Sequence, residues 1–323
     1  MRAVVVSKPG GPEAARVVDV PTPRPGPGEV RIRVGAASVN PVDAFVRSGL
    51  AARAGLVPAR DVLGLGWDVA GAIDQVGEGV TGFAEGDAVV ALSDRLDRPT
   101  SGYAEQIVLD ADAVAAAPAN WTIEQAATLP LNGLTAAQAL DLLDLRPGQT
   151  LLVTGAAGAV GGYAVELATA AGLLVVGSST AGDEALVRGF GARWFVPRGG
   201  PGGPGEPGGS GGPLGVAVRA LVPGGVDGVL DAAVLGVAAH DALRGGGGFV
   251  SVRAGGEPPA LRGSRVHNVF VRADGRQLAE LVAQARADRL TPRVAETFPL
   301  DKVAVAHRRL AEGGLRGRLV LIP

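Results

Sequence analysis

The stretch from Thr154 to Gly162 constrains this chain more than any other feature. It reads Thr-Gly-Ala-Ala-Gly-Ala-Val-Gly-Gly and lies between two apolar runs, at 150–153 and 163–168. This order predicts a strand, a glycine turn and a helix, with glycines that let the backbone turn sharply and let a pyrophosphate approach. The helix N-terminus adds unpaired N–H groups and a partial positive charge. A glycine triplet alone also fits an ordinary turn, but this context favours dinucleotide binding.

The pattern of apolar residues predicts two kinds of domain. Residues 1–121 read as β-rich, because their apolar runs are separated by proline and glycine clusters. Strands and helices alternate over 122–260, which is the signature of an α/β fold with a doubly wound parallel sheet. Residues 261–323 break this alternation, and we expect them to return to the first domain.

Composition excludes several classes of protein. The 323 residues carry 30 basic and 32 acidic side chains, so neither nucleic acid nor an anionic membrane is an expected partner. Cysteine is absent, which excludes disulfides, thiol nucleophiles and cysteine-ligated zinc. The apolar run at the N-terminus is too short for a signal peptide. A membrane-spanning helix is not expected either, because the sequence contains no run of about 18 apolar residues. We therefore expect a cytoplasmic protein.

One segment, 199–213, consists almost only of glycine and proline, interrupted by Glu206 and Ser210. Without apolar side chains, nothing there offsets the entropy of ordering, so the composition predicts a flexible loop. Two interpretations of this loop are open: it is a mobile lid, or it is an insertion that the protein surface tolerates. The insertion is favoured because long surface loops cost little free energy.

Five segments together resemble one family, the medium-chain dehydrogenase/reductases, and within it the zinc-independent, zeta-crystallin-like quinone oxidoreductases. The resemblance covers essentially the whole chain. It implies a GroES-like β-barrel domain, a Rossmann domain that binds the coenzyme, and an active site in the cleft between them. Family members are commonly homodimers or tetramers, so a homodimer is expected. The segments are Val-Asn-Pro-Val-Asp at 39–43, Gly-Trp-Asp-Val-Ala-Gly at 66–71, Leu-Pro-Leu-Asn-Gly-Leu-Thr-Ala at 129–136, Gly-Ala-Ala-Gly-Ala-Val-Gly at 155–161 and Gly-Arg-Leu-Val-Leu at 317–321.

The zinc ligands of the related alcohol dehydrogenases are missing. Where those enzymes place a cysteine and a histidine, this chain has Asn40 and Trp67, which cannot complete a tetrahedral zinc site. The three histidines, His240, His267 and His307, lie far apart and outside any ligand motif. Without a Lewis acid, alkoxide stabilisation in alcohol oxidation is lost. Reduction of a conjugated carbonyl needs less help, so quinones, enones or enoyl thioesters are the expected substrates, with no metal.

The second strand of the predicted Rossmann sheet indicates which coenzyme is bound. It runs over 173–177 and is followed by Ser178, Ser179 and Thr180. An NAD enzyme places an acidic residue at this strand end to bind the ribose hydroxyls. Small hydroxyl residues do not repel a 2′-phosphate and can donate hydrogen bonds to it, so NADPH is the expected coenzyme.

Two residues complicate the prediction of NADPH. NADPH-specific relatives carry a lysine where this chain has Asp183, which would oppose a phosphate if it faced one. They also often carry a tyrosine where this chain has Arg198. Arg198 can pair bidentately with the phosphate in place of the lysine, or it can be a solvated arginine at the start of a loop. The sequence leaves both readings open.

The resemblance also implies contacts to the rest of the coenzyme. Thr135 is expected near the nicotinamide amide, and Asn40 near the nicotinamide ribose or the substrate. Val234 follows the fourth strand and is expected beside a ribose. The complete set of expected coenzyme contacts is Thr135, Gly155, Ala157, Gly158, Ala159, Val160, Gly161, Ser178, Ser179, Thr180, Arg198, Val234, Ser251, Arg253, Phe270, Val271 and Arg318.

The sequence offers no clear proton donor for catalysis. Many quinone reductases of this family carry a tyrosine where this chain has Phe45, and Tyr103 and Tyr163 are expected to be structural. Water can protonate a reduced quinone, since its oxygen is a weak base. Asn40 is therefore the candidate that orients substrate or ribose, while Phe45 and Trp67 are candidates for an apolar wall. Trp67 fits a core role equally well.

Three functions remain open from the sequence. The leading one is NADPH-dependent reduction of quinones or other α,β-unsaturated carbonyl compounds by hydride transfer. The second is an enoyl-thioester reductase of a biosynthetic, polyketide-like pathway. The third is a non-catalytic NADPH-binding protein, which the missing tyrosine at Phe45 allows.

Overall fold

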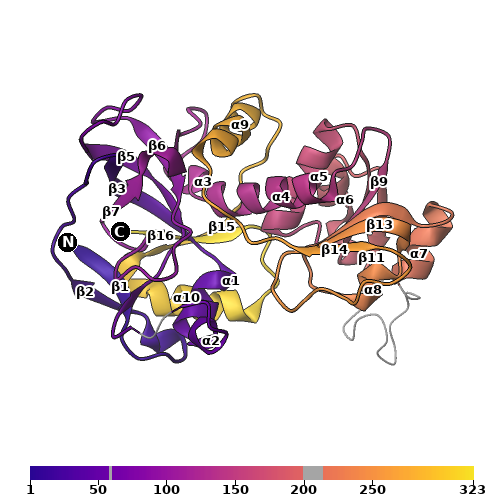
Figure 1. Ribbon diagram of the computed structural model, residues 1–323, viewed down its shortest axis with the longest axis horizontal. Coiled ribbons are helices and arrows are strands. Elements are labelled where there is room, and N and C mark those ends of the chain that lie inside the picture. Colours follow the sequence, from indigo (N-terminus) through magenta and orange to yellow (C-terminus); the bar gives the residue numbers. More distant parts are fainter. Residues whose placement is uncertain (58–59, 199–213) are drawn as a thin grey trace. The chain divides into compact units, whose positions relative to one another are not determined.

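The computed structural model describes residues 1–57, 60–198 and 214–323, so the glycine- and proline-rich segment lies outside the described residues. The chain forms two compact units (Figure 1). No helix in the described residues has the length and apolar character needed to cross a membrane. The first unit comprises Met1–Leu134, Arg272–Asp288 and Pro292–Pro323, and the second comprises Thr135–Val271 and Arg289–Thr291.

The first unit is built mainly from antiparallel strands. They are β1 (Arg2–Val6), β2 (Arg16–Asp19), β3 (Glu29–Val39), β4 (Leu63–Gly64), β5 (Asp68–Val76), β6 (Ala88–Leu92), β7 (Gln106–Asp110), β8 (Val114–Ala116), β15 (Val294–Pro299) and β16 (Arg318–Ile322). The long strand β3 pairs with β5, β7 and β16. Its pairing with β16 places the last strand of the chain beside the N-terminal strands.

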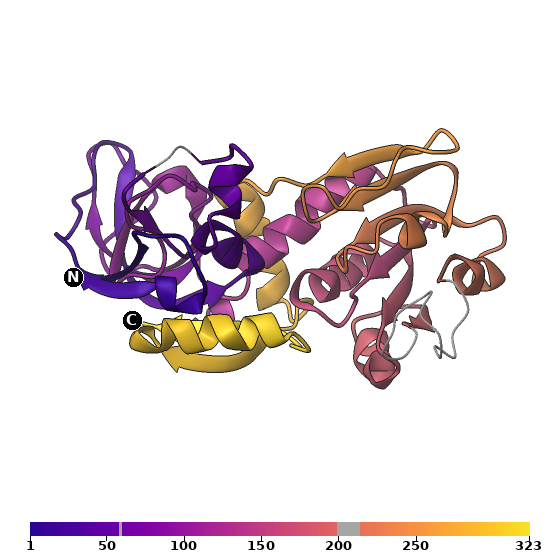
Figure 2. The ribbon, with the colours of Figure 1, turned by 90° about the horizontal axis from the view of Figure 1, so that it is seen from below.

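The first unit also contains helices. They are α1 (Pro41–Arg47), α2 (Leu50–Arg53), α3 (Ile123–Ala126), the start of α4 (Pro130–Leu143), α9 (Gly275–Arg286) and α10 (Val303–Glu312). In Figure 2, α10 runs alongside the strand β15, both in yellow. The sequence pattern did not predict α1, although its start is well marked. Asn40 is its N-cap, Pro41 takes the first helical position, and the Asn40 N–H donates to Asp43 Oδ2 at 2.8 Å.

The second unit contains a six-stranded parallel sheet, which confirms the predicted Rossmann-type fold. Its strands are β9 (Thr150–Thr154), β10 (Leu174–Ser179), β11 (Trp194–Pro197), β12 (Val226–Asp231), β13 (Leu243–Ser251) and β14 (Arg265–Asn268). Its helices are α5 (Ala159–Ala170), α6 (Glu184–Gly189), α7 (Leu214–Leu221) and α8 (Val237–His240), with a short 3-10 turn over Ala181–Asp183. The strand order is β11-β10-β9-β12-β13-β14, so the chain reverses direction across the sheet between β9 and β12.

Several element boundaries differ from the sequence prediction. β10 extends through Ser178 and Ser179, which were expected to follow the strand, because β11 pairs with it that far. β14 (Arg-Val-His-Asn) was not predicted, since its mostly polar residues do not indicate a strand, although it pairs with β13. The helix α4 begins at Pro130, four residues before the expected start at Leu134.

Candidate active site

The carboxyl ends of the parallel strands in the second unit meet at one edge of the sheet. The register aligns Ser178, Thr154, Asp231, Ser251 and Asn268 in a single row across five strands. In open α/β sheets, ligands bind outside this edge, where the strand order reverses. That point lies between β9 and β12, so the glycine turn that follows β9 occupies the expected place for a ligand.

The glycine turn is wound too tightly for other residues. Gly155 has φ +61°, in the left-handed region that favours glycine. A Cβ on Gly161 would collide with the carbonyl oxygen of Gly155, and one on Gly158 would lie 3.1 Å from the same atom. Gly158 is the N-cap of α5, which begins at Ala159. The start of α5 therefore presents backbone without a capping side chain, and its first N–H groups have no acceptor in their own helix. These features fit a diphosphate.

The segment after β12 is strained and firmly held beside this turn. Val234 has φ +56°, which is rare for a β-branched residue. The Thr154 hydroxyl donates to Asp231 Oδ1 at 2.5 Å and accepts from the Ala233 N–H at 3.0 Å. The other carboxylate oxygen of Asp231 accepts from the Gly236 N–H at 2.8 Å. Strain of this kind collects at functional sites, where surrounding bonds maintain it.

The end of β10 combines hydroxyls, a carboxylate and an arginine. The hydroxyls of Ser179 and Thr180 both donate to Asp183 Oδ2, each at 2.6 Å. Asp183 is buried, with 7% of its surface exposed, and Ser178 is buried with 2% exposed. The exposed Arg198 follows β11, and its backbone N–H donates to the Ser179 carbonyl at 2.6 Å. The side chains of these residues therefore gather at the predicted coenzyme edge, but both hydroxyl protons are directed to Asp183.

The other expected coenzyme contacts of the second unit lie on separate elements. Thr135 is buried on α4, with 5% exposed. Ser251 ends β13, and its hydroxyl donates to the carbonyl of Arg253 at 3.1 Å. Arg253 itself is exposed. Phe270 and Val271 follow β14, and Phe270 is 64% exposed.

In the first unit, Asn40 is held by a buried carboxylate. Its Nδ2 donates to Asp68 Oδ2 at 2.6 Å and to the Ser38 carbonyl at 3.4 Å. The Ser38 carbonyl is an acceptor, and so is the Asp68 carboxyl when it is ionised, so the amide nitrogen faces them in that state. The Asn40 Oδ1 is buried and has no hydrogen-bond partner among the described residues. Asp68 Oδ1 in turn accepts from the Leu131 N–H at 2.6 Å, in the first turn of α4.

Two buried carboxyl groups beside Asn40 have raised pKa values. Burial raises the pKa of Asp68 to about 7, against the lowering effect of its hydrogen bonds from Leu131 and Asn40. Burial likewise raises the pKa of Asp43 to about 6, although Asp43 accepts from the Tyr103 hydroxyl at 2.8 Å. The sequence analysis missed both carboxyl groups as candidates. The available signal was an acidic residue directly before the apolar run Val-Ala in the Gly-Trp-Asp-Val-Ala-Gly segment.

The remaining site candidates of the first unit have different environments. Phe45, on α1, packs against the hydrophobic core of this unit. Trp67 is half-buried just before β5, and its carbonyl accepts from the Ser93 N–H at 2.7 Å. Arg318, the first residue of β16, donates from Nε and Nη2 to Asn132 Oδ1 at 2.9 and 2.7 Å.

The histidines do not gather. His240 lies on α8, His267 on β14 and His307 on α10. Across residues 1–57, 60–198 and 214–323, no three histidine or acidic side chains are grouped to hold a metal ion.

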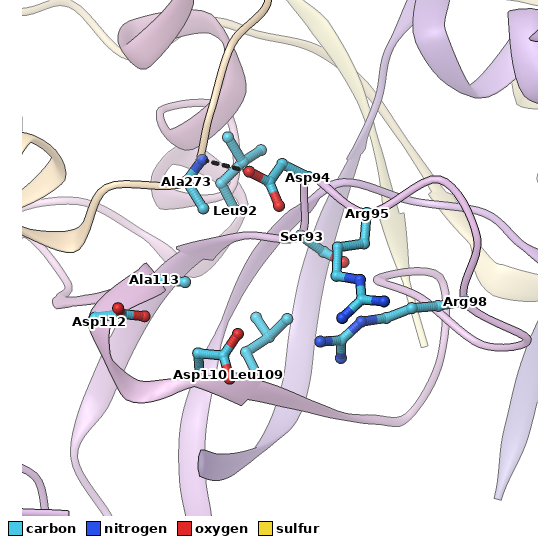
Figure 3. Close-up of a pocket in the computed structure, with 10 residues that line it drawn as sticks. All are labelled: Leu92, Ser93, Asp94, Arg95, Arg98, Leu109, Asp110, Asp112, Ala113 and Ala273. Atoms are coloured by element: carbon cyan, nitrogen blue, oxygen red, sulfur yellow. Dashed lines mark hydrogen bonds between the residues drawn. The ribbon is translucent and has the colours of Figure 1, made fainter. Parts of the chain in front are cut away.

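A small pocket of about 160 Å³ opens in the first unit (Figure 3). Arg95, Arg98 and Asp110 line it together with Asp94, whose carboxylate accepts from the Ala273 N–H at 2.8 Å. None of the expected site residues contributes to its lining.

Two family models match the chain. Residues 26–119 match the alcohol dehydrogenase GroES-like domain, which confirms the expected fold of the first domain. Residues 214–321 match the model described as zinc-binding dehydrogenase.

Curated relatives point to oxidoreductases. A rat quinone oxidoreductase is 38% identical over 186 residues, an alignment that takes in 57% of this chain and 54% of that protein. This chain thus spans about half the length of that relative. A human quinone oxidoreductase is 28% identical over 330 residues, covering 100% of this chain and 98% of that protein. A spectinabilin polyketide synthase protein of Streptomyces orinoci is 32% identical over 307 residues, 90% of this chain and 13% of that protein.

Solved structures share the fold over the full length. A protein described as an NAD-dependent alcohol dehydrogenase is 32% identical with a TM-score of 0.84, covering 100% of both chains. A mycobacterial protein solved in complex with NADPH is 28% identical with a TM-score of 0.82, again over 100% of both chains. Together with the glycine turn at the switch point of the sheet, these matches show that the chain belongs to the medium-chain dehydrogenase/reductase family of oxidoreductases.

Proposed function

We propose that this protein reduces quinones or other α,β-unsaturated carbonyl compounds with NADPH, by hydride transfer and without zinc. The glycine turn over 155–161 carries the proposal, because its tight winding and the bare start of α5 suit a dinucleotide diphosphate. The names of the curated relatives support the quinone as acceptor.

The chain's own residues suggest how a coenzyme is held. The N–H groups of Ala159, Val160 and Gly161 would hold the diphosphate, because the helix dipole favours negative charge there. Val234, three residues after β12, and Ser251, the last residue of β13, would flank the remainder of the coenzyme. When bound, the coenzyme supplies the hydride.

The donor set at the zinc-ligand positions does not suit a metal. The Asn40 amide nitrogen is committed to Asp68 and Ser38, and Trp67 has no ligating atom. The family model named for zinc binding covers 214–321, which includes neither Asn40 nor Trp67. These observations support zinc-free reduction of a conjugated carbonyl.

The orientation of Asn40 limits its catalytic role. Since its N–H groups are used by protein acceptors, only Oδ1 remains to meet a ligand. An amide oxygen only accepts hydrogen bonds, so Asn40 does not donate to a substrate carbonyl, and its side chain is fully buried in this structure. None of the three catalytic candidates, Asn40, Phe45 and Trp67, has a side chain that can donate a proton to the product. The product is therefore protonated by water.

The direct test monitors loss of the reduced-nicotinamide absorbance in stopped flow, with 1,4-benzoquinone, cyclohexenone and crotonyl-CoA as acceptors. Quinone or enone turnover by metal-free protein is expected. The variant Gly161→Ala should lose coenzyme binding through its collision with Gly155. Gly189→Ala is the matched control, because a Cβ at Gly189 meets nothing within 4 Å. Turnover that requires added zinc would contradict the proposal.

An enoyl-thioester reductase is the second candidate, favoured by the match to a polyketide synthase over 90% of the chain. A kcat/KM for crotonyl-CoA well above that for benzoquinone would select it. A non-catalytic NADPH-binding protein is the third, and it would bind coenzyme yet leave it unoxidised with every acceptor.

We also propose a homodimer. β14 is an edge of the six-stranded sheet, with no further strand beside it among the described residues. Leu261 and Phe270, on either side of β14 in the sequence, are 51% and 64% exposed. An edge strand flanked by exposed apolar residues favours pairing with another chain. Light scattering on the purified protein would give the mass directly.

A further inference from the structure

The end of β10 carries two opposing determinants of coenzyme choice, Asp183 and Arg198. An acidic residue at this edge of a Rossmann sheet serves the ribose hydroxyls of NADH, whereas an arginine accommodates the 2′-phosphate of NADPH. This chain has both. Provided that the protein binds a nicotinamide coenzyme, as its proposed function requires, these two residues determine which of the two coenzyme forms the site accepts.

The hydrogen bonds at Asp183 decide what the neighbouring hydroxyls can offer. A serine or threonine hydroxyl has a single proton. Ser179 and Thr180 both give theirs to Asp183 Oδ2, at 2.6 Å each. Ser179 and Thr180 are half-buried, and neither hydroxyl has a second proton to donate to a ligand. Acceptors pair with the ribose hydroxyls of NADH and do not pair with a phosphate dianion.

The negative charge of Asp183 disfavours a 2′-phosphate, as the orientation of the two hydroxyls does. The carboxylate of Asp183 is buried, with 7% exposed, directly behind the two hydroxyls. Charges at partly buried positions are screened less than charges in water, so it opposes a second negative group near the strand end.

Arg198 supplies the opposite charge at the same strand end. Ser179 pairs with Pro197 across β10 and β11, and the next residue, Arg198, donates its backbone N–H to the Ser179 carbonyl at 2.6 Å. Its side chain is exposed and forms no ion pair with any described residue. A guanidinium at this position has free donors for a phosphate.

We propose that Asp183 keeps this coenzyme site open to NADH, so that the protein uses both NADH and NADPH, with recognition of the 2′-phosphate resting on Arg198. Asp183 acts through the two hydroxyls, which it orients, and is thus a specificity-determining positioning residue.

The test measures binding on the full chain by titration calorimetry, independently of catalysis. The probes are NADPH, NADH, 2′,5′-ADP and 5′-AMP. The unmodified protein should bind NADPH and NADH with dissociation constants within about tenfold of each other, a difference of about 1.4 kcal/mol. Asp183→Asn should raise the preference for NADPH by about tenfold, and Arg198→Ala should lower it by about tenfold and weaken its salt dependence. The preference for 2′,5′-ADP over 5′-AMP should follow the same order.

Matched variants control for general charge effects. Glu184→Gln removes the neighbouring carboxylate, which is exposed and paired with Arg188, and should leave the coenzyme preference unchanged. Arg193→Ala removes an arginine that lies over the Trp194 ring, at the other end of β11, and should also leave it unchanged. Asp183→Ala is a second route to releasing both hydroxyls if Asp183→Asn fails to fold.

Three results would overturn the inference. They are a preference of the unmodified protein for either coenzyme well above about a hundredfold, an unchanged preference in both Asp183 variants, or an equal effect of Glu184→Gln. Failure of the proposed reductase would look different, since both coenzymes would then bind but no acceptor would oxidise them.

Discussion

The carboxyl group of Asp68 should make the stability of this protein depend on pH in a predictable direction. Burial raises the pKa of Asp68 from 3.8 to about 7 in the folded protein. Between these values the folded chain holds a proton that the unfolded chain has released. The folded state therefore binds more protons, and the free energy of unfolding falls as pH rises from about 4 to about 7. A shift of about three units corresponds to about 4 kcal/mol at 1.36 kcal/mol per unit.

The perturbation is Asp68→Asn, which stays neutral at every pH. Its Oδ1 still accepts from the Leu131 N–H, while its Nδ2 meets the Asn40 amide, which must turn over to present its oxygen. This rearrangement shifts stability by an offset that is the same at all pH values. The raised pKa of Asp43 contributes a slope to both proteins, so most of that slope is removed in their difference; what remains reflects the electrostatic coupling between Asp43 and Asp68, which the substitution abolishes.

The assay is urea unfolding of both proteins at about pH 5 and about pH 8, with unfolding free energies from linear extrapolation. Relative to its parent, the variant should gain about 3 kcal/mol of stability between these two pH values, which is the share of the pH dependence that falls inside this window. An unchanged difference would refute the raised pKa. A difference of opposite sign would mean that the start of α4 stabilises the Asp68 carboxylate more than burial penalises it.

Three further substitutions test individual parts of the fold. Thr154→Val removes the hydroxyl that joins β9 to β12 and should cost about 1–3 kcal/mol in urea unfolding, because Asp231 then loses a buried donor; an unchanged midpoint would show that this bond adds nothing. Val234→Gly relieves a positive φ and should raise stability by about 1 kcal/mol, measured by calorimetry, whereas a loss would indicate that packing of the valine outweighs the strain. Thr122→Ala removes the N-cap of α3, which accepts from the Gln125 N–H at 3.3 Å, and should cost about 1 kcal/mol, with Thr122→Ser as a control that keeps the cap.

Local sequence patterns were enough to predict most elements of the second unit and some elements of the first. The glycine turn, the alternation of strands with helices and the bounds of β3 all derive from spacing that a short window of sequence contains. The capping pair of Thr122 and Gln125 was also readable, because cap and partner lie three residues apart. The extra strand β14 was not, since a strand in a sheet depends on its neighbour more than on its own residues.

The features of the candidate site likewise fall into those that the sequence predicts and those that only the fold shows. The glycine turn, the absence of the zinc-ligand residue types and the residue types at the end of β10 can be read from the sequence alone. That the Ser179 and Thr180 hydroxyls point to Asp183, and that Asn40 is held by Asp68, 28 positions away, follows only from the fold. Hydrogen-bond direction and carboxyl pKa values depend on which groups burial brings together, and local spacing does not record that.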